Sequence, residues 1–269
     1  MKPRTRRLPF ALLLAAPAVF AAADAGEPEE AFRALTLYRF PEARAGFEEA
    51  GGTPAARFGL ALALINLQPK TEANLARADA LLDTLTVTAG TDPELARAAR
   101  FYRGRIAQVH RRQPDPAAAQ RLFRGLMDEA PDTFWGQFAG VKWTTLEIYT
   151  AGPPGERAAR LAQLESLTPF FTLPRFAKDY HNIMANAYEA LGLSDERAFA
   201  HLAACWRIGI ARGVDQGDFL ARLGTLAERL GRRDDARAYY AEFLQRFQRD
   251  ERRHLIARRL DTLGASARP

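Results

Sequence analysis

The sequence predicts an all-α protein built as an array of helix pairs, and three observations carry this prediction. Alanine, leucine, arginine and glutamate dominate after Gly26, and apolar and polar residues alternate only over a short stretch at 84–88. Glycine and proline interrupt the pattern often enough to leave segments of roughly 12 to 18 residues, an ordinary length for helices. Small and bulky residues recur at similar spacings along the chain, which favours an array over a simple bundle.

The first 25 residues predict an export signal. A basic start at 2–7 precedes a short apolar run at 8–23, and Ala23-Asp24-Ala25 fits a cleavage site with small residues, so we expect cleavage after Ala25. The alternative is an uncleaved anchor, but the run contains two prolines and falls short of the ~20 apolar residues that a membrane span needs. A twin-arginine signal fits less well, because Phe10 is one place late. We therefore expect a periplasmic or secreted protein.

Charge and cysteine usage exclude several classes of protein. The net charge of the full chain is +6, and loss of four basic residues and one acidic residue with the signal lowers it to +3. Such a small charge gives no reason to expect a nucleic-acid partner. Cys205 is the single cysteine, so the chain forms no internal disulfide and has no cysteine for lipidation at the cleavage site. After cleavage we expect no stable insertion into a membrane.

The clearest repeat lies between Gly217 and Asp250. Counted from Gly217 as the first place, small, bulky and turn residues take places 4, 7, 8, 11, 15, 20, 24 and 27 of a 34-residue unit: Leu220, Leu223, Gly224, Ala227, Gly231, Ala236, Tyr240 and Phe243. This spacing resembles the tetratricopeptide repeat. Ala227 replaces the usual aromatic residue at place 11, and Gln248 replaces the usual proline at place 32.

Weaker copies of the same pattern lie upstream. The small residues of the first helices are Gly59, Gly104, Gly140, Ala185 and Gly224, and the alanines of the second helices are Ala43, Ala78, Ala119, Ala198 and Ala236. The resemblance implies a right-handed α-solenoid of about six units in a single domain, 26–269. The units lie near 28–54, 55–90, 93–131, 133–168, 176–213 and 217–250, and a capping helix follows at 251–263. The second helix of the fourth unit fits poorly.

The repeat spacing has a physical reason. Places 7, 8 and 11 share one face of a helix, and places 20, 24 and 27 share one face of its partner. Small residues at places 8 and 20 let the two helices approach closely, so we expect Gly224 to pack against the helix of Ala236. In the capping helix, the spacing predicts that Leu255, Ile256, Leu260 and Leu263 face inward.

The resemblance also implies a concave groove lined by the first helices at places 2, 5, 9 and 12. Where the register is clear, the candidate groove residues are Arg105, Gln108, Phe134, Gln137, Val141, Asn182, Asn186 and Thr225, with Thr144, Glu189 and Glu228 at equivalent places. Amides, an arginine and an aromatic ring suit an extended peptide, although they also suit an ordinary polar surface. We therefore expect a scaffold or adaptor that binds a protein or peptide partner.

No residue cluster predicts catalysis, a cofactor or a metal. None of the three serines lies in a Gly-x-Ser-x-Gly setting, and no glycine-rich phosphate loop is present. His201 and Cys205 are four residues apart, but two ligands do not make a metal site, so we expect a buried thiol beside a surface histidine.

Three alternatives stay open at this point. Glu147 beside Trp143 could act on a sugar, which would make the chain a glycan-binding or cell-wall-processing protein. The chain could also serve as a homo-oligomeric spacer. The diphenylalanine Phe170-Phe171, bracketed by two prolines, either packs over the fourth unit or lines a pocket.

Overall fold

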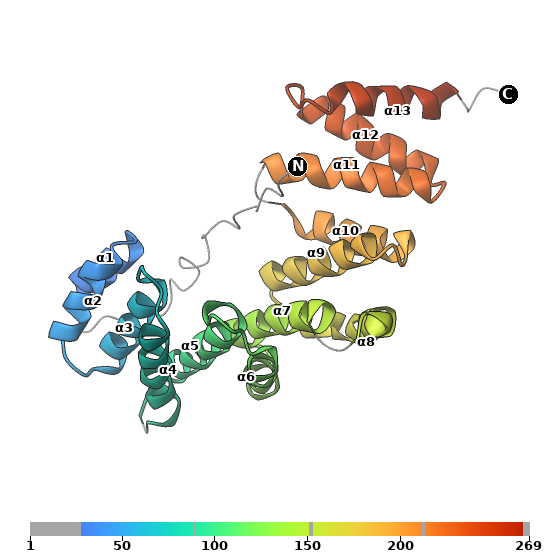
Figure 1. Ribbon diagram of the computed structural model, residues 1–269. Coiled ribbons are helices and arrows are strands. Elements are labelled where there is room, and N and C mark those ends of the chain that lie inside the picture. The colour runs from blue at the N-terminus through green and yellow to red at the C-terminus, as the bar shows by residue number, and fades with distance from the viewer. Residues whose placement is uncertain (1–27, 89, 151–152, 211–212, 266–269) are drawn as a thin grey trace. The chain divides into compact units, whose positions relative to one another are not determined.

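The computed structural model describes residues 28–88, 90–150, 153–210 and 213–265, and this part of the chain is helical, with no strand (Figure 1). The prediction of an all-α fold is confirmed. The expected export signal at 1–25 lies outside the described residues. The chain divides into two compact units, Met1–Ala139 and Gly140–Pro269, and the division falls within one helix.

The first unit holds three helix pairs in sequence order. Its helices are α1 (Glu29–Thr36), α2 (Phe40–Glu49), α3 (Pro54–Asn66), α4 (Glu72–Val87), α5 (Pro93–Arg105), the π-helix η1 (Ile106–His110), α6 (Pro116–Glu129) and the start of α7 (Phe134–Tyr149). Each of the helices α1 to α5 packs on the next, and α3 also contacts both α1 and α5. The first helices of successive pairs therefore lie side by side, as in a helical solenoid.

The second unit continues with the same alternation. It holds the rest of α7, then η2 (Pro154–Glu156), α8 (Arg157–Leu164), the 3₁₀ segment η3 (Glu165–Phe170), α9 (Pro174–Ala190), α10 (Asp195–Ile208), α11 (Gly213–Arg229), α12 (Arg233–Arg246) and α13 (Arg253–Ala265). From α9 to α13 each helix packs on the next. The exact boundaries of the six repeat units stay a prediction.

Local sequence signals set the helix ends. Side chains accept hydrogen bonds from the first turns of α3, α4, α5, α6 and α10, which is the usual role of an N-cap; these caps are Thr53, Thr71, Asp92, Asp115 and Ser194. Gly192 and Gly231 follow α9 and α11 with φ of 61° and 70°. An L-side chain is disfavoured there, so the glycine at place 15 of these two units ends the first helix and opens the turn.

The small residues of the first helices receive aromatic rings. A Cβ at Gly224 would lie 2.3 Å from the Tyr240 ring, one at Gly104 would lie 2.5 Å from the Phe123 ring, and one at Gly59 would lie 2.3 Å from Phe47. The expectation that Gly224 packs against the helix of Ala236 is therefore refined: the residue that fills the space is Tyr240, one turn later on α12. At Gly59 the ring comes from the preceding helix, α2.

The fourth pair keeps this contact with an altered second helix. After Pro153, α8 is short and continues as the 3₁₀ segment η3, which contains Pro169. The two phenylalanines that follow pack over the fourth unit: a Cβ at Gly140 would lie 2.6 Å from Phe170 and 3.1 Å from Phe171. The Phe171 ring also stacks on Tyr180 at 4.6 Å between centroids. Of the two open alternatives for this segment, packing is the observed one.

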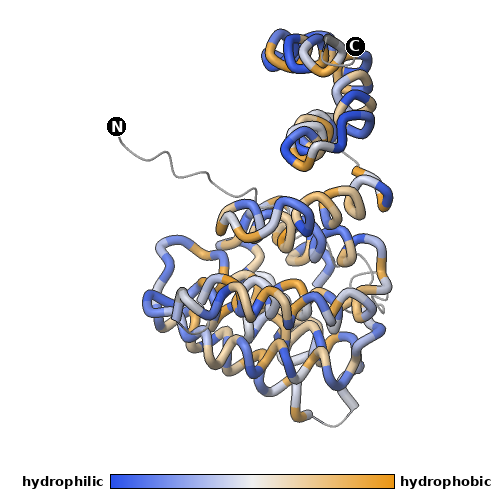
Figure 2. Tube along the Cα trace, turned by 90° about the vertical axis from the view of Figure 1, so that its right-hand side faces the viewer, coloured by the Kyte–Doolittle hydropathy of each residue, from blue (hydrophilic) through white to orange (hydrophobic). Residues whose placement is uncertain are grey.

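Burial follows an amphipathic pattern in most of the described helices. Figure 2 shows hydrophilic and hydrophobic residues interspersed along them. α3 and α7 are exceptions, because each residue from Phe58 to Asn66 and each residue from Trp135 to Val141 is buried. In α13, Ile256 and Leu263 are buried, but Leu255 is 54% exposed, so the expectation that Leu255 faces inward is wrong. Leu255 lies about 100° around the helix from Ile256, which takes it off the inner face.

Candidate partner-binding surface

Two candidate groove positions of the fifth unit meet the first helix of the sixth. Asn186 is exposed and Glu189 is half-buried on α9, and both face Arg222 of α11. Arg222 Nη2 donates to Asn186 Oδ1 at 2.8 Å and to the Glu189 carboxylate. Asn182, half-buried, lies one turn earlier on α9. We call Asn182, Asn186, Glu189 and Arg222 the α9–α11 face.

The hydrogen bonds on this face orient its polar groups. Because the guanidinium of Arg222 holds the Asn186 oxygen, the two amide hydrogens of Asn186 are directed elsewhere. The carboxylate of Glu189 neutralises the arginine, so the face is polar with little net charge. Such an arrangement suits hydrogen bonding to the backbone of an extended chain.

Thr225, the groove candidate on α11, lies inside a hydrogen-bonded network. Its hydroxyl donates to the Ala221 carbonyl at 2.9 Å and lies 3.4 Å from the Tyr240 hydroxyl. Tyr240 donates to Glu228 Oε2 at 2.8 Å, and Arg259 of α13 reaches the same carboxylate at 3.1 Å. Thr225 and Glu228 therefore help to join α11, α12 and α13.

Arg105 and Gln108 lie at the junction of α5 and the π-helix η1, and both are half-buried. Arg105 donates to the Gln108 side-chain oxygen, and burial lowers its pKa. Nearby, Lys70 Nζ lies 3.1 Å from His110 Nδ1. Burial, and then the charges of Lys70 and Arg105, lower the pKa of His110 to about 4, so this imidazole is neutral at pH 7 and accepts the hydrogen bond from Lys70.

The candidates on α7 are less accessible. Phe134 is half-buried, and its ring meets the Trp135 ring edge-on at 5.0 Å between centroids. Gln137 is 0% exposed and Val141 is 4% exposed. A groove role for Gln137 and Val141 stays a prediction, and the other candidates, on α5, η1, α9, α11 and at the start of α7, are half-buried or exposed.

The sequence did not predict the chain of polar groups that lies where η3, α9 and α10 pack together. His201 was expected on the surface, but it is 5% exposed. Its Nδ1 lies 2.7 Å from His181 Nδ1, and its Nε2 lies 3.1 Å from both carboxylate oxygens of Glu165. Tyr188 donates to Glu165 Oε1 at 2.8 Å, and Arg197 lies 3.2 Å from the same oxygen. We call Glu165, His201 and His181 the histidine relay.

Local structure explains why this relay could not be read from the sequence. Glu165 opens η3 in the unit whose second helix matches the repeat poorly, and the two histidines come from opposite helices of the next pair. Burial alone would raise the pKa of Glu165, but hydrogen bonds from Tyr188, His201 and Arg197 and the charge of His201 lower it overall. Cys205, expected to be buried, is 0% exposed, and burial raises its pKa to about 12.

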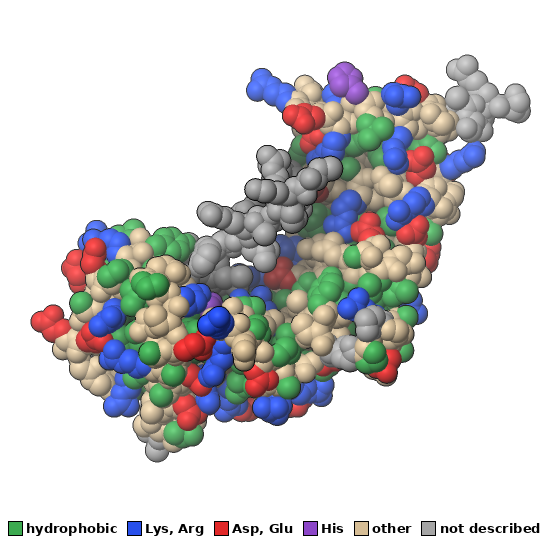
Figure 3. Space-filling view, in the orientation of Figure 1, with side chains coloured by type: hydrophobic (Ala, Val, Ile, Leu, Met, Phe, Trp, Pro, Cys, Tyr) green, Lys and Arg blue, Asp and Glu red, His purple; other side chains and the backbone are tan. Residues whose placement is uncertain are grey.

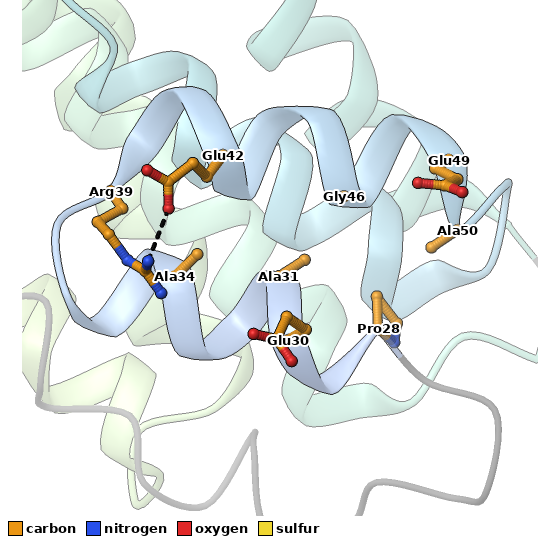
Figure 4. A pocket seen from close by; sticks show the side chains of 9 residues that line it. All are labelled: Pro28, Glu30, Ala31, Ala34, Arg39, Glu42, Gly46, Glu49 and Ala50. Atoms are coloured by element: carbon orange, nitrogen blue, oxygen red, sulfur yellow. Dashed lines mark ion pairs between the residues drawn. The ribbon is translucent and has the colours of Figure 1, made fainter.

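A shallow hollow of about 400 Å³ lies between α1 and α2 (Figure 4). Small side chains, Ala31 and Ala34, lie along it, and Gly46 approaches Ala31 so closely that an added Cβ would lie 2.9 Å from the alanine methyl. An ion pair between Arg39 and Glu42, 2.9 Å apart, borders one end. Small residues therefore line the hollow where the two helices of the first pair approach each other.

The described residues were also expected to offer one alternative site, at Glu147. Glu147, the candidate for action on a sugar, is half-buried on α7, and its backbone carbonyl accepts from Arg160 Nη1 at 3.3 Å. Within the described ranges, no three His, Cys, Asp or Glu side chains are grouped to hold a metal ion. None of the helices described here combines the length and apolar character that crossing a membrane requires. Basic and acidic side chains are intermixed over the visible face (Figure 3).

Comparisons with known proteins give a distant structural likeness. No model of a known protein family matches the sequence, and no curated protein matches it. Among solved structures, the chain is similar to the crystal structure of a thermophilic tetratricopeptide-repeat protein of Thermus thermophilus, with 17% identity over 88% of this chain and 96% of that one, and a TM-score of 0.34. The description of this chain as a helical-repeat protein rests on its own helix pairs.

Proposed function

We propose that this chain is an exported scaffold of tetratricopeptide-like repeats that binds a protein or peptide partner in the cell envelope through the faces of its first helices. The observation that carries the proposal is the α9–α11 face. Two positions counted as groove positions from the repeat register, Asn186 and Glu189, share one arginine of the next first helix. The register therefore brings polar groups of successive units onto a common face.

The chemistry of this face favours an extended peptide over a small metabolite. A peptide offers a backbone carbonyl and amide at every residue, and fixed amide and guanidinium groups on adjacent helices can pair with them in turn. The second candidate region, Arg105 with Gln108, offers the same donor types on α5 and η1. No enzymatic activity is part of this proposal.

Site-specific photocrosslinking in the producing cell tests partner binding. We expect p-benzoylphenylalanine at position 186 to give a discrete protein adduct that mass spectrometry can identify. The matched control is the same substitution at the exposed Arg237 of the second helix α12, which should give none. The double variant Asn186→Ala, Arg105→Ala should lose the partner in co-purification while keeping its helicity, because Arg222 retains its ion pair with Glu189.

Three outcomes would contradict the proposal. Adducts from position 237 without adducts from 186 would place the binding surface elsewhere. A purified chain whose mass still includes residues 1–25 would contradict export. Release of soluble fragments from cell-wall glycan by the purified protein would favour the glycan-processing alternative.

A further inference from the structure

The two histidines of the relay are close enough to require a shared proton. His181 Nδ1 and His201 Nδ1 lie 2.7 Å apart, which is a hydrogen-bond distance. A hydrogen bond between two imidazole nitrogens forms only when one of them carries a proton and the other presents its lone pair. With a proton on both, two N–H groups would point at each other and two positive charges would be in contact.

The surroundings of the pair disfavour protonation of both rings at once. Glu165 accepts from His201 Nε2 at 3.1 Å and stabilises a positive charge on that ring. His201 is buried, and among the described residues Glu165 is the one carboxylate whose charge acts on His181. The other titratable or charged groups around the pair are Tyr180 and Tyr188 of α9 and Arg197 and Arg207 of α10, so both charged neighbours besides Glu165 are cationic.

We infer that His181 and His201 form an acid-sensitive latch that holds α9 against α10 and η3 while the pair carries at most one extra proton, and that opens when both rings are protonated. Closure keeps the Nδ1–Nδ1 hydrogen bond and the bond to Glu165. Double protonation replaces the hydrogen bond between the two rings by repulsion between two positive charges at a buried position. The helices α9 and α10 therefore separate there. The latch joins three elements, α9, α10 and η3, so its opening changes how these elements pack on one another.

The direction of the pH dependence follows from the environment of His181. Burial first, and then the charges of His201 and Arg207, lower its pKa from 6.5 to about 4, against the opposing effect of Glu165. The unfolded chain therefore takes up this proton at higher pH than the folded chain does. The stability that depends on neutral His181 is present above pH 6.5 and is lost as the pH falls toward 4.

The latch has a consequence for binding that rests on the proposed function. Asn182 follows His181 directly on α9, and Asn186 lies one turn further. Opening of the latch would therefore loosen the helix that carries the α9–α11 face, and acid would release a partner held there. The latch itself is testable without a partner.

The first test is an NMR titration of the four histidine rings in the full chain, assigned with single His→Gln variants. We expect the His181 ring to take up its proton at a pH of about 4 and the His201 signals to shift in the same transition, because a hydrogen bond joins the two rings. His254, exposed on α13, is the reference ring. If His181 and His201 titrate independently of each other, in the manner of isolated rings, the inference is overturned.

The second test compares unfolding by urea at pH 7 and pH 5. For a pKa that changes from 6.5 to about 4 on folding, His181 alone multiplies the unfolding equilibrium constant about twentyfold over this interval, and His110, whose pKa is likewise lowered to about 4, contributes a comparable factor in the wild type and in the His181 variant. His181→Gln should reduce the total rise about twentyfold and leave the contribution of His110, because a glutamine amide hydrogen-bonds His201 in either protonation state without adding charge. His254→Gln should keep the total rise. An unchanged rise in His181→Gln would refute the latch, while the photocrosslinking result would be unaffected.

Discussion

Replacing Gly224 by alanine should destabilise the protein, contrary to what helix propensity predicts. A Cβ at this position would lie 2.3 Å from Tyr240 Cε1 and 2.5 Å from Cδ1, much closer than two carbon atoms approach. The ring cannot easily move aside. Tyr240 is 0% exposed, and its hydroxyl is held by Glu228 at 2.8 Å and lies 3.3 Å from Arg259.

The magnitude follows from two opposing effects. Alanine is favoured over glycine within a helix by ~1 kcal/mol. Forcing an extra methyl group into a packed core costs ~1–3 kcal/mol, and moving the ring would also weaken hydrogen bonds that contribute ~1 kcal/mol each. Steric cost exceeds propensity, so we expect a net loss of about 1–3 kcal/mol in the free energy of unfolding.

Urea denaturation of the purified chain, followed by circular dichroism at 222 nm, measures this loss. The matched control is Gly125→Ala, because Gly125 is also inside a helix, α6, but is exposed and has no atom within 4 Å of an added Cβ. We expect Gly125→Ala to stabilise the protein by up to ~1 kcal/mol. In a Tyr240→Leu background, Gly224→Ala should become neutral or stabilising, since the atoms that it meets are gone.

Two results would refute this reasoning. If Gly224→Ala unfolds at the same urea concentration as the wild type or a higher one, the ring does not fix the position of the glycine. If Tyr240→Leu fails to relieve the loss, the destabilisation has a source other than contact with this ring. The double-variant cycle separates the two outcomes, because it measures the coupling between the two residues directly.

Two further predictions concern buried and exposed side chains. Cys205 should react with Ellman's reagent at pH 8 only as fast as the protein opens, because the thiol is 0% exposed and its pKa is raised to about 12. Rapid labelling of the native protein would contradict the observed burial. On α13, Leu255→Lys should change the free energy of unfolding by less than ~0.5 kcal/mol, whereas Ile256→Ala should lower it by ~2–4 kcal/mol. Thermal unfolding measures both changes. Equal effects would show that the helix is rotated from its observed orientation.

The repeat spacing was sufficient to predict the helix pairs, because each pair depends on a small residue and a bulky residue at fixed places. The end of the helix before Gly231 was also predictable, because the repeat register makes this glycine the turn residue. The orientation of α13 could not be predicted in this way. An inner face inferred from leucines alone placed Leu255 together with Ile256, although consecutive residues on a helix point in different directions.

The polar sites were harder to predict, for a different reason. Asn186 could be placed on an outward face by counting from the glycine register, but its partner Arg222 lies at a place that the groove count does not include. The histidine relay joins residues from three elements, one of them a 3₁₀ segment with no counterpart in the other described pairs. The repeat spacing predicts contacts that recur from unit to unit. It cannot predict a contact such as the histidine relay, which belongs to one unit and its neighbour.

The contact between a glycine and an aromatic ring explains how the array tolerates a variable repeat length. The ring reaches Gly104 from residue 123, Gly224 from residue 240 and Gly140 from residue 170, and in each case it comes from further along the chain. The number of residues between the glycine and the ring differs from pair to pair. The extra residues lie in turns and in short 3₁₀ or π segments, which take no part in the contact. The packing therefore constrains the two contacting residues and leaves the connection free to lengthen. Substitutions at the glycines should destabilise the fold, whereas insertions in the turns that follow the first helices should be tolerated.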